Sequence, residues 1–480
     1  MTSTADEIPE PFFDRTRELA ILDRAWQECR TQLVTMWGRR RVGKSALLSH
    51  FAQNKRAIYL YGTRASEREI LAALALQASA VTGDRYVGAV PFPTWDLAFQ
   101  YLETIPKDER LLIVLDEFPY ICEATQGLDT LVQRWWDHIQ HTTRFMLVIA
   151  GSAHSFMAGL TVYSEALHGR RTASVQVDPF DYLDAARFLQ NVPAADRVRA
   201  YAFFGGMPAY LRHFDPDMNL HENLQRTLFA PGHVLYTEGD ELLRTEFYME
   251  AMYAAILRAI ACGEQKPSDI ARSVGKHSAD EVFDYIRRLQ VVRLIERETP
   301  ITEWRQVRSR RSLYCLADPY LRAWFRFVWP NRSFLQLGQT AQVWEGEVAP
   351  HLDEFVARTT WEEVCMQHLW RRVATRTLPV DFTHLGRWWD NQDEIDLVGL
   401  WQDEIRLVGE CKWTAAPVDE RVLASLQRKA AKLDLERPPL WVLASRSGFD
   451  DALRRRAEHG EILLIEPDDL FAPDLVGVSV

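Results

Sequence analysis

The chain has 480 residues, more than one ordinary hydrophobic core holds, so we expect about three domains. A hydrophobic fraction of 47% with 26% charged residues excludes a disordered chain, and a net charge of -11 disfavours indiscriminate coating of nucleic acid. The six cysteines form no C-x-x-C pair, which argues against a disulfide framework and favours the reducing cytoplasm. The acidic start and the lack of a long apolar stretch predict neither export nor membrane insertion.

The clearest motif is GRRRVGKS at residues 38–45, which fits the phosphate-loop pattern G-x-x-x-x-G-K-[ST] and follows an apolar, strand-like run. Gly38 and Gly43 let the backbone curl so that its N–H groups face phosphates. Lys44 reaches the outer phosphates, and Ser45 offers its hydroxyl to Mg²⁺. The motif predicts that the chain binds ATP with Mg²⁺; a glycine turn with an incidental lysine is the alternative.

A second motif, LLIVLDEF at residues 111–118, reads as a buried strand that ends in acidic residues. Asp116 is expected to hold the Mg²⁺ water shell, and Glu117 to polarise the attacking water. Apolar runs at 56–62 and 144–152, with helix-like stretches between the strands, predict a doubly wound parallel sheet. Ser152, at the end of the last run, either senses the γ-phosphate or caps a turn.

Several segments resemble the archaeal-type ATPase family, in the AAA/STAND branch of P-loop NTPases. They are FFDRTRELAIL (12–22), SEALHGRRT (164–172), VDPFDYLDA (177–185) and FFGGMPAYL (203–211). The resemblance places Arg15 and Glu18 at the nucleotide, with Asp14 where the family has glycine. Arg170 and Arg171 are candidates for a clamp on the transition state, with surface ion pairing as the alternative. Gly205, Gly206 and Pro208 resemble the Gly-x-Pro signature of a helical lid.

The resemblance implies four domains: an ATPase core at 1–190, a lid at 191–240, a winged helix-turn-helix at 241–325 and a nuclease-like domain at 326–480. The middle module is predicted from a helix at 247–262, a second between Pro267 and Gly275, a third begun by a capping box of Ser278 and Glu281, and a two-stranded wing. Seven arginines (305, 308, 310, 311, 322, 326 and 332) interleave with tryptophans around this wing. They are either a nucleic-acid patch or a solvated face.

Residues 394–413 have strand character around a polar turn at 402–404. If the turn centres on Asp403, Asp396 lies opposite Glu410, because each is seven residues from the centre. Lys412 shares that face, so two carboxylates able to bind a divalent cation gather with a lysine able to orient water or stabilise a developing charge. A one-residue slip would scatter them. E-x-K alone is weak, because residues 264–266 match it too.

This group resembles the PD-(D/E)XK nucleases, and HLGRWWDNQDEIDLVG with GECKW resembles the C-terminal domain of unknown function that accompanies archaeal-type ATPases. The resemblance implies that Glu362, in the helix-like WEEVCMQHLW, completes the metal site; an exposed helix acid is the alternative. Trp388, Trp389 and Trp413 either stack on bases or belong to the core.

The sequence therefore predicts an ATPase whose nucleotide state gates a metal-dependent nuclease acting on DNA or RNA. The alternative is an ATP-driven switch whose nuclease-like domain is noncatalytic. Nucleic acid, a second copy of the chain and another protein are the partners that the sequence leaves open.

Overall fold

The computed structural model describes residues 12–13, 15–105, 110–152, 169–247, 251–306, 309–472 and 475, without the side chains of 245–247. Asp14, Arg308 and the first part of the 164–172 segment lie outside the described residues. The chain divides into two compact units, Met1–Asp178 and Pro179–Val480. The division falls before residue 190, where the predicted ATPase core ended.

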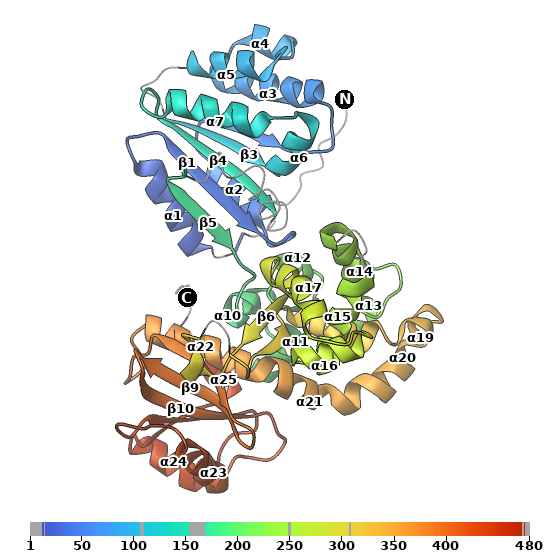
Figure 1. Ribbon diagram of the computed structural model, residues 1–480, viewed down its shortest axis with the longest axis vertical. Coiled ribbons are helices and arrows are strands. Elements are labelled where there is room, and N and C mark those ends of the chain that lie inside the picture. The colour runs from blue at the N-terminus through green and yellow to red at the C-terminus, as the bar shows by residue number, and fades with distance from the viewer. Residues whose placement is uncertain are drawn as a thin grey trace. The chain divides into compact units, whose positions relative to one another are not determined.

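The first unit contains a parallel sheet of five strands in the order β2-β3-β4-β1-β5 (Figure 1). The strands are β1 (Gln32–Gly38), β2 (Ala57–Tyr61), β3 (Leu111–Asp116), β4 (Phe145–Ser152) and β5 (Ala173–Val177). The apolar runs correctly predicted the first four strands, since strands covered on both faces are continuously apolar. The sequence analysis missed β5, an edge strand with only two buried residues.

Helices cover both faces of this sheet. On one face lie α3 (Glu67–Thr82), α5 (Trp95–Glu103) and α7 (Leu128–Ile139), and on the other α1 (Thr16–Gln27) and α2 (Lys44–Ala52) (Figure 1). Two short helices, α4 (Arg85–Ala89) and α6 (Phe118–Ala124), complete the unit. The capping box of Ser66 and Glu69 begins α3 as the pattern requires. The predicted doubly wound α/β core is confirmed.

The second unit begins with a helical region. Its helices are α10 (Tyr182–Ala185), α11 (Ala194–Phe204), α12 (Pro208–Leu211), α13 (Leu220–Arg226) and α14 (Val234–Phe247). Of these, α11, α12 and α13 lie within residues 191–240, for which a helical lid was predicted, and α14 begins there. Gly206 lies so close to Phe180 that a Cβ there would come within 1.7 Å of the Phe180 carbonyl oxygen.

Three helices and an antiparallel pair of strands follow: α15 (Ala251–Ala261), α16 (Pro267–Ser273), α17 (Asp280–Val291), β6 (Ile295–Glu298) and β7 (Leu313–Leu316). These are the elements expected of a winged helix-turn-helix, and that assignment stays a prediction. Only one of the two hydrogen bonds of the predicted capping box before α17 forms. Glu281 accepts a hydrogen bond from the Ser278 amide, but α17 begins after Ala279 and has no side-chain cap.

A largely helical stretch leads to the last domain. Its helices are α18 (Pro319–Ala323), α19 (Arg332–Gln336), α20 (Thr340–Val343), α21 (Leu352–Val356) and α22 (Glu362–Ala374), with π-helical turns at Trp324–Val328, Trp344–Val348 and Ala357–Trp361. No helix among the described residues has the length and apolarity needed to cross a membrane.

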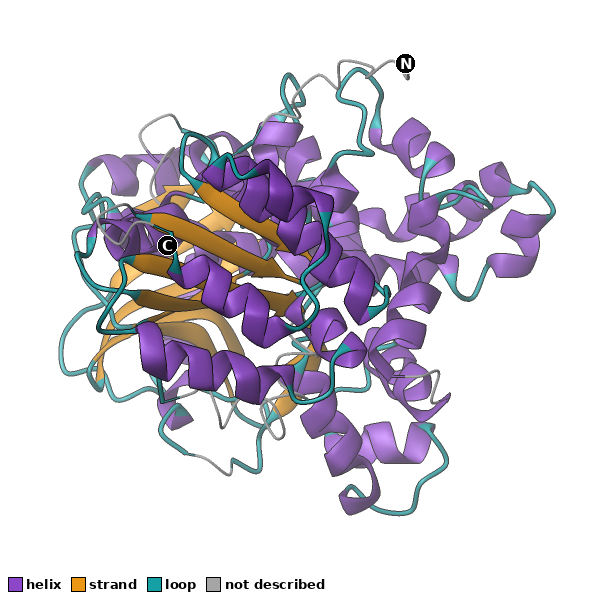
Figure 2. Cartoon of the chain, turned by 90° about the horizontal axis from the view of Figure 1, so that it is seen from above, coloured by secondary structure: helices purple, strands orange, loops and turns teal. Residues whose placement is uncertain are grey.

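The last domain is a mixed sheet of five strands in the order β12-β11-β10-β9-β8. The strands β8 (His384–Trp389), β9 (Glu394–Trp401) and β10 (Glu404–Lys412) are antiparallel, whereas β11 (Leu440–Ser445) and β12 (Ile462–Ile465) run parallel to β10. The helices α23 (Glu420–Ala430) and α24 (Asp451–Glu458) pack on one face, and α25 (Pro467–Leu470) ends the domain (Figure 1). Figure 2 shows the strands in orange among the purple helices. The α/β class is confirmed; the nuclease fold stays a prediction.

Candidate functional site

The phosphate-loop motif joins a central strand to a helix. β1 ends at Gly38, and α2 begins at Lys44 after Gly43, whose φ of 97° suits glycine. A Cβ at Gly38 would lie 2.3 Å from the Val177 carbonyl oxygen, so β5 passes directly against the loop. Lys44 is buried, and its Nζ donates to the carbonyls of Gly38 and Arg39, each at 3.1 Å. Amides at a helix N-terminus and a lysine held over the loop suit a bound polyphosphate.

Asp116 lies beside this loop at the end of β3 and is fully buried. Its Oδ2 accepts a 2.7 Å hydrogen bond from the Tyr59 hydroxyl, which also lies 3.5 Å from the Ser45 carbonyl oxygen. Burial, and then the charge of Asp116, raises the pKa of Tyr59, so the phenol stays a donor. The carboxylate of Asp116 and the hydroxyl of Ser45 are hard oxygen donors, which fit Mg²⁺.

Glu117 occupies a strained position next to Asp116. Its backbone is left-handed, with φ 50° and ψ 44°, which costs a non-glycine residue about 1 kcal/mol. Gly62 makes room for it, because a Cβ there would lie 2.3 Å from the Glu117 carbonyl oxygen. Strain of this kind is concentrated at active sites, and it fits the predicted role of Glu117 in orienting water.

Two further predicted residues lie close to the phosphate loop. Ser152 is the residue of β4 that pairs with Gly38. Arg15 is buried, and its guanidinium donates to the Val42 carbonyl at 2.7 Å and to the Asp178 carbonyl at 2.6 Å. Arg15 therefore ties the loop to the end of β5, and its contact with a nucleotide stays a prediction.

The prediction for Arg170 needs correction. Its guanidinium forms a two-pronged ion pair with Asp137 of α7, with Nε 2.5 Å from Oδ1. Arg170 precedes β5, whose first residue pairs with Val34 near the start of β1, so it lies at the amino edge of the sheet. The phosphate loop lies at the carboxyl edge. Arg170 is therefore not a clamp on the nucleotide of its own chain.

The hairpin of β9 and β10 has the predicted register where it matters. Near the turn, Ile405 pairs with Leu400, which is one residue away from the predicted register. If this shift continued along the hairpin, the predicted site residues would not share one position. A β-bulge between Ile405 and Leu407 corrects it, and Gly409 pairs with Leu397. The ladder of paired residues ends there, so the placement of Glu410 opposite Asp396 stays a prediction.

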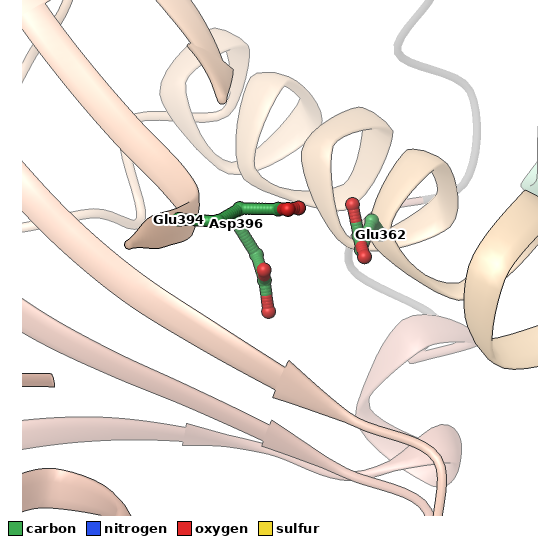
Figure 3. Close-up of side chains that lie close together, drawn as sticks. All are labelled: Glu362, Glu394 and Asp396. Carbon is green, nitrogen blue, oxygen red and sulfur yellow. The ribbon is translucent and has the colours of Figure 1, made fainter. Parts of the chain in front are cut away.

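Three carboxylates gather at the start of this hairpin. Glu362, in the first turn of α22, and Glu394 and Asp396, on β9, have oxygens within 4.8 Å of one another (Figure 3). The Oδ2 atom of Asp396 accepts a 2.8 Å hydrogen bond from the Cys411 amide. Burial and the charge of Glu410 raise the pKa of Asp396 to about 6, and burial and the charge of Asp396 raise that of Glu362 to about 8. This acidic cluster favours a bound cation, because the carboxylates repel one another when ionised.

The structure corrects the predicted ligand set. Asp396 and Glu362 belong to the acidic cluster, but Glu410 does not. Its carboxylate pairs with Lys412 at 2.6 Å and with Lys429 of α23 at 2.9 Å. Burial lowers the pKa of Lys412, but the charge of Glu410 outweighs it, and the net change is upward. We refer to these three residues as the Glu410 triad.

The sequence analysis missed three residues of this site. Glu394 had a readable signal, because it lies two residues before Asp396 and so shares its strand face. Lys429 and Arg387 had none. Arg387, on β8, lies 3.1 Å from Glu362 and 3.1 Å from Glu298 of the wing, and also pairs with Glu394. It is the internal counter-ion of the acidic cluster.

Aromatic and basic candidates around the site turn out to be largely structural. Trp388 and Trp413 are buried, and the Trp413 indole donates to Asp353 at 3.1 Å, which supports the core interpretation. Of the six wing arginines that the structure describes, four form ion pairs: Arg305 with Asp403, Arg311 with Glu303, Arg322 with Glu363 and Arg332 with Asp240. These ion pairs favour the solvated-face interpretation of the wing arginines over a nucleic-acid patch.

Residues 12–214 match the family described as "ATPase domain predominantly from Archaea". The chain belongs to the archaeal-type P-loop ATPases. Residues 324–429 of this ATPase match a second family, "Archaea bacterial proteins of unknown function", which begins close to the predicted start of the last domain.

Relatives of this archaeal-type ATPase occur in Methanocaldococcus jannaschii. The uncharacterized protein MJECL04 is 29% identical over 419 residues, which are 84% of this chain and 87% of that protein. The uncharacterized ATP-binding protein MJ0423 is 44% identical over 45 residues, which are 9% of this chain and 76% of that protein. The solved structure of the Walker-type ATPase PABY2304 of Pyrococcus abyssi matches with a TM-score of 0.46 and 19% identity, covering 66% of this chain and 96% of that chain.

Proposed function

We propose that the chain is a cytoplasmic ATPase of the AAA/STAND type whose nucleotide state gates a metal-dependent nuclease acting on DNA or RNA. In this proposal residues 191–240 are a lid, 241–325 a winged helix-turn-helix, and 326–480 a PD-(D/E)XK-like effector. ATP and Mg²⁺ would bind at Gly38, Gly43, Lys44, Ser45 and Asp116, with Glu117 orienting the attacking water.

One observation carries the nuclease half of the proposal. The acidic cluster lies at the start of the β9–β10 hairpin, beside the strand that carries Glu410 and Lys412. Carboxylates whose oxygens lie close together suit a divalent cation, which polarises a phosphodiester and activates water. Lys412 is the group that would then orient that water or stabilise the charge that develops on the phosphate.

A second function is favoured by the same residues. Three of these carboxylates already have protein cations: Arg387 pairs with Glu362 and Glu394, and two lysines pair with Glu410. A site neutralised from within is stable without a metal. The alternative is therefore an ATP-driven switch in which the last domain binds a partner without cleaving it.

Cleavage assays separate these two functions. Supercoiled plasmid, single-stranded DNA and RNA are incubated with Mg²⁺ or Mn²⁺, and wild type is compared with Asp396→Asn and with Asp403→Asn, an exposed acid in the hairpin turn. Metal-dependent cleavage that is lost in Asp396→Asn and kept in Asp403→Asn supports the nuclease. Intact ATP hydrolysis with no cleavage of any substrate moves the proposal to the switch.

A further inference from the structure

The segment that leaves the ATPase sheet is held by a buried arginine of α22. The guanidinium of Arg371 forms a two-pronged ion pair with Asp181, with bonds of 2.5 and 2.8 Å, and a third bond of 2.7 Å to Asp184. Arg371 is only 1% exposed, so these charges are shielded from water. A planar guanidinium that binds two carboxylates at once fixes both position and orientation.

Two more side chains of α22 hold the residue between these aspartates. The Tyr182 amide donates to Gln367 Oε1 at 3.0 Å, and its hydroxyl lies 3.1 Å from Nδ1 of His368. The same hydroxyl donates to the Leu470 carbonyl at 2.9 Å. Positions 367, 368 and 371 lie on one side of a helix, so α22 grips this segment with a continuous face.

The upstream end of the segment is tied to the phosphate loop. Val177 lies against Gly38, and Arg15 donates both to the Val42 carbonyl within the loop and to the Asp178 carbonyl. Asp181 follows Asp178 by three residues. Three residues of fully extended chain span about 10 Å. Only Pro179 and Phe180 separate the residue that Arg15 binds from the residue that Arg371 binds.

The segment is also fixed to the predicted lid. The Phe180 amide donates to the Gly206 carbonyl at 2.8 Å, and the Phe180 carbonyl fills the place of a Cβ at Gly206. A change in the position of Gly206 therefore moves Phe180 with it. The phosphate loop and the predicted lid are the parts of the ATPase expected to change position when the bound nucleotide changes.

The downstream end is the acidic cluster. Glu362 precedes Arg371 by nine residues on the same helix, which corresponds to about 13 Å of rigid rod. A helix transmits a shift or tilt at one end to the other with little loss, because its hydrogen bonds resist bending. A shift or tilt of α22 at Arg371 would therefore be carried to Glu362.

We propose that residues 178–185 are the coupling segment through which nucleotide state reaches the acidic cluster, with Arg371 as its anchor on α22. The inference rests on the proposed function, because it names how the effector is regulated. Arg371 is a positioning residue, because its guanidinium pairs with Asp181 and Asp184 and would act on the acidic cluster through α22. The winged module is not required for this route.

Hydrogen exchange of the full chain tests the coupling. Exchange of residues 362–374 is measured by mass spectrometry with Mg²⁺ and either ADP or a nonhydrolysable ATP analogue. In wild type we expect the two nucleotides to differ by at least about threefold in the exchange rate of this helix. In Arg371→Met the difference disappears while both nucleotides still bind. Arg372→Met is the matched control, since its guanidinium donates to Thr377 instead, and it should respond as wild type does.

A milder variant keeps the test decisive if Arg371→Met fails to fold. Tyr182→Phe removes one hydroxyl and should at least halve the nucleotide-dependent difference. The inference is overturned if wild-type α22 exchanges equally in both nucleotides, or if the folded variants respond like wild type. Exchange is measured without cleavage, so failure of the nuclease proposal leaves this result readable, and ATP-gated cleavage with an unresponsive α22 overturns the coupling alone.

Discussion

The Cys411 amide donates a 2.8 Å hydrogen bond to Oδ2 of Asp396 and so fixes one carboxylate of the acidic cluster to the neighbouring strand. This bond favours the ionised carboxylate, whereas burial and the charge of Glu410 favour the protonated form and prevail. A divalent cation would reverse the balance.

Glu394 is the first residue we would test, because Glu394→Gln removes one charge from the cluster with little change of shape. We expect Mn²⁺ to bind at least about tenfold more weakly, since hard cations prefer full carboxylates. Titration calorimetry of the full chain measures this. Glu404→Gln, in the same sheet but paired with Arg406 and Arg437, is the control and should bind as wild type does. Equal affinity in Glu394→Gln would remove this residue from the site.

Lys44→Ala should weaken ATP binding by at least about tenfold, because the loop loses the cation that faces the outer phosphates. Fluorescent nucleotide binding gives the affinity. Lys55→Ala is the control, because Lys55 bonds to the Phe51 carbonyl away from the loop. ATP binding that survives Lys44→Ala unchanged would contradict the assignment of the loop.

Glu117→Gln should keep ATP bound but lower the hydrolysis rate by at least about 100-fold, as expected when a group that orients and deprotonates water is lost. The left-handed backbone of Glu117 tolerates glutamine as well as it does glutamate, so folding is preserved. Phosphate release under saturating ATP is the measurement. A hydrolysis rate within a factor of a few of the wild-type rate would mean that a residue other than Glu117 activates the attacking water.

Gly206→Ala should destabilise the second unit, because the new Cβ would lie 1.7 Å from the Phe180 carbonyl oxygen and must displace backbone. We expect its melting transition to fall by at least about 4 °C. Gly346→Ala serves as the control, since nothing lies within 4 Å of its Cβ position. An unchanged transition in Gly206→Ala would place the Phe180 backbone elsewhere.

His368 gives a pH dependence of known sign. Burial, and then the charge of Arg372, lowers its pKa from 6.5 to about 3, so the folded chain holds it neutral while the unfolded chain protonates it. The contribution of His368 to the free energy of unfolding is fully present above pH 6.5 and is lost progressively as the pH falls towards 3. Between pH 7 and 5, the free energy of unfolding of wild type should fall by roughly 1–2 kcal/mol more than that of His368→Gln.

Denaturant unfolding of wild type and His368→Gln at several pH values measures this difference. His459→Gln, which alters an exposed histidine, should follow the wild-type profile. Parallel pH profiles for wild type and His368→Gln would show that His368 is protonated equally in both states.

The sequence predicted the parts of the fold that rest on local pattern. Apolar runs located four strands, and equal spacing from the turn predicted the register beyond the bulge near Ile405, where Leu407 pairs with Gly399 and Gly409 with Leu397. The edge strand β5 alternates and is short, so it escaped notice. Arg170 was misplaced for the same reason, since its position follows from where β5 begins.

The rest of the site depends on contacts that no local pattern records. Lys429 reaches Glu410 only because α23 folds back over β10, and Arg387 reaches Glu362 only because β8 lies beside the start of α22. Both are long-range consequences of packing. Glu394 is different, because its spacing of two residues from Asp396 is enough to predict that both side chains lie on the same face of the strand.

Cleavage in one reaction mixture tests the central claim most directly. Wild type, Lys44→Ala and Asp396→Asn are incubated with nucleic acid, Mn²⁺ and ATP, a nonhydrolysable ATP analogue or ADP. The account predicts that wild type cleaves at a rate set by the nucleotide, that Lys44→Ala cleaves independently of nucleotide, and that Asp396→Asn does not cleave. Cleavage by Asp396→Asn at the wild-type rate, or wild-type cleavage indifferent to nucleotide, would contradict it.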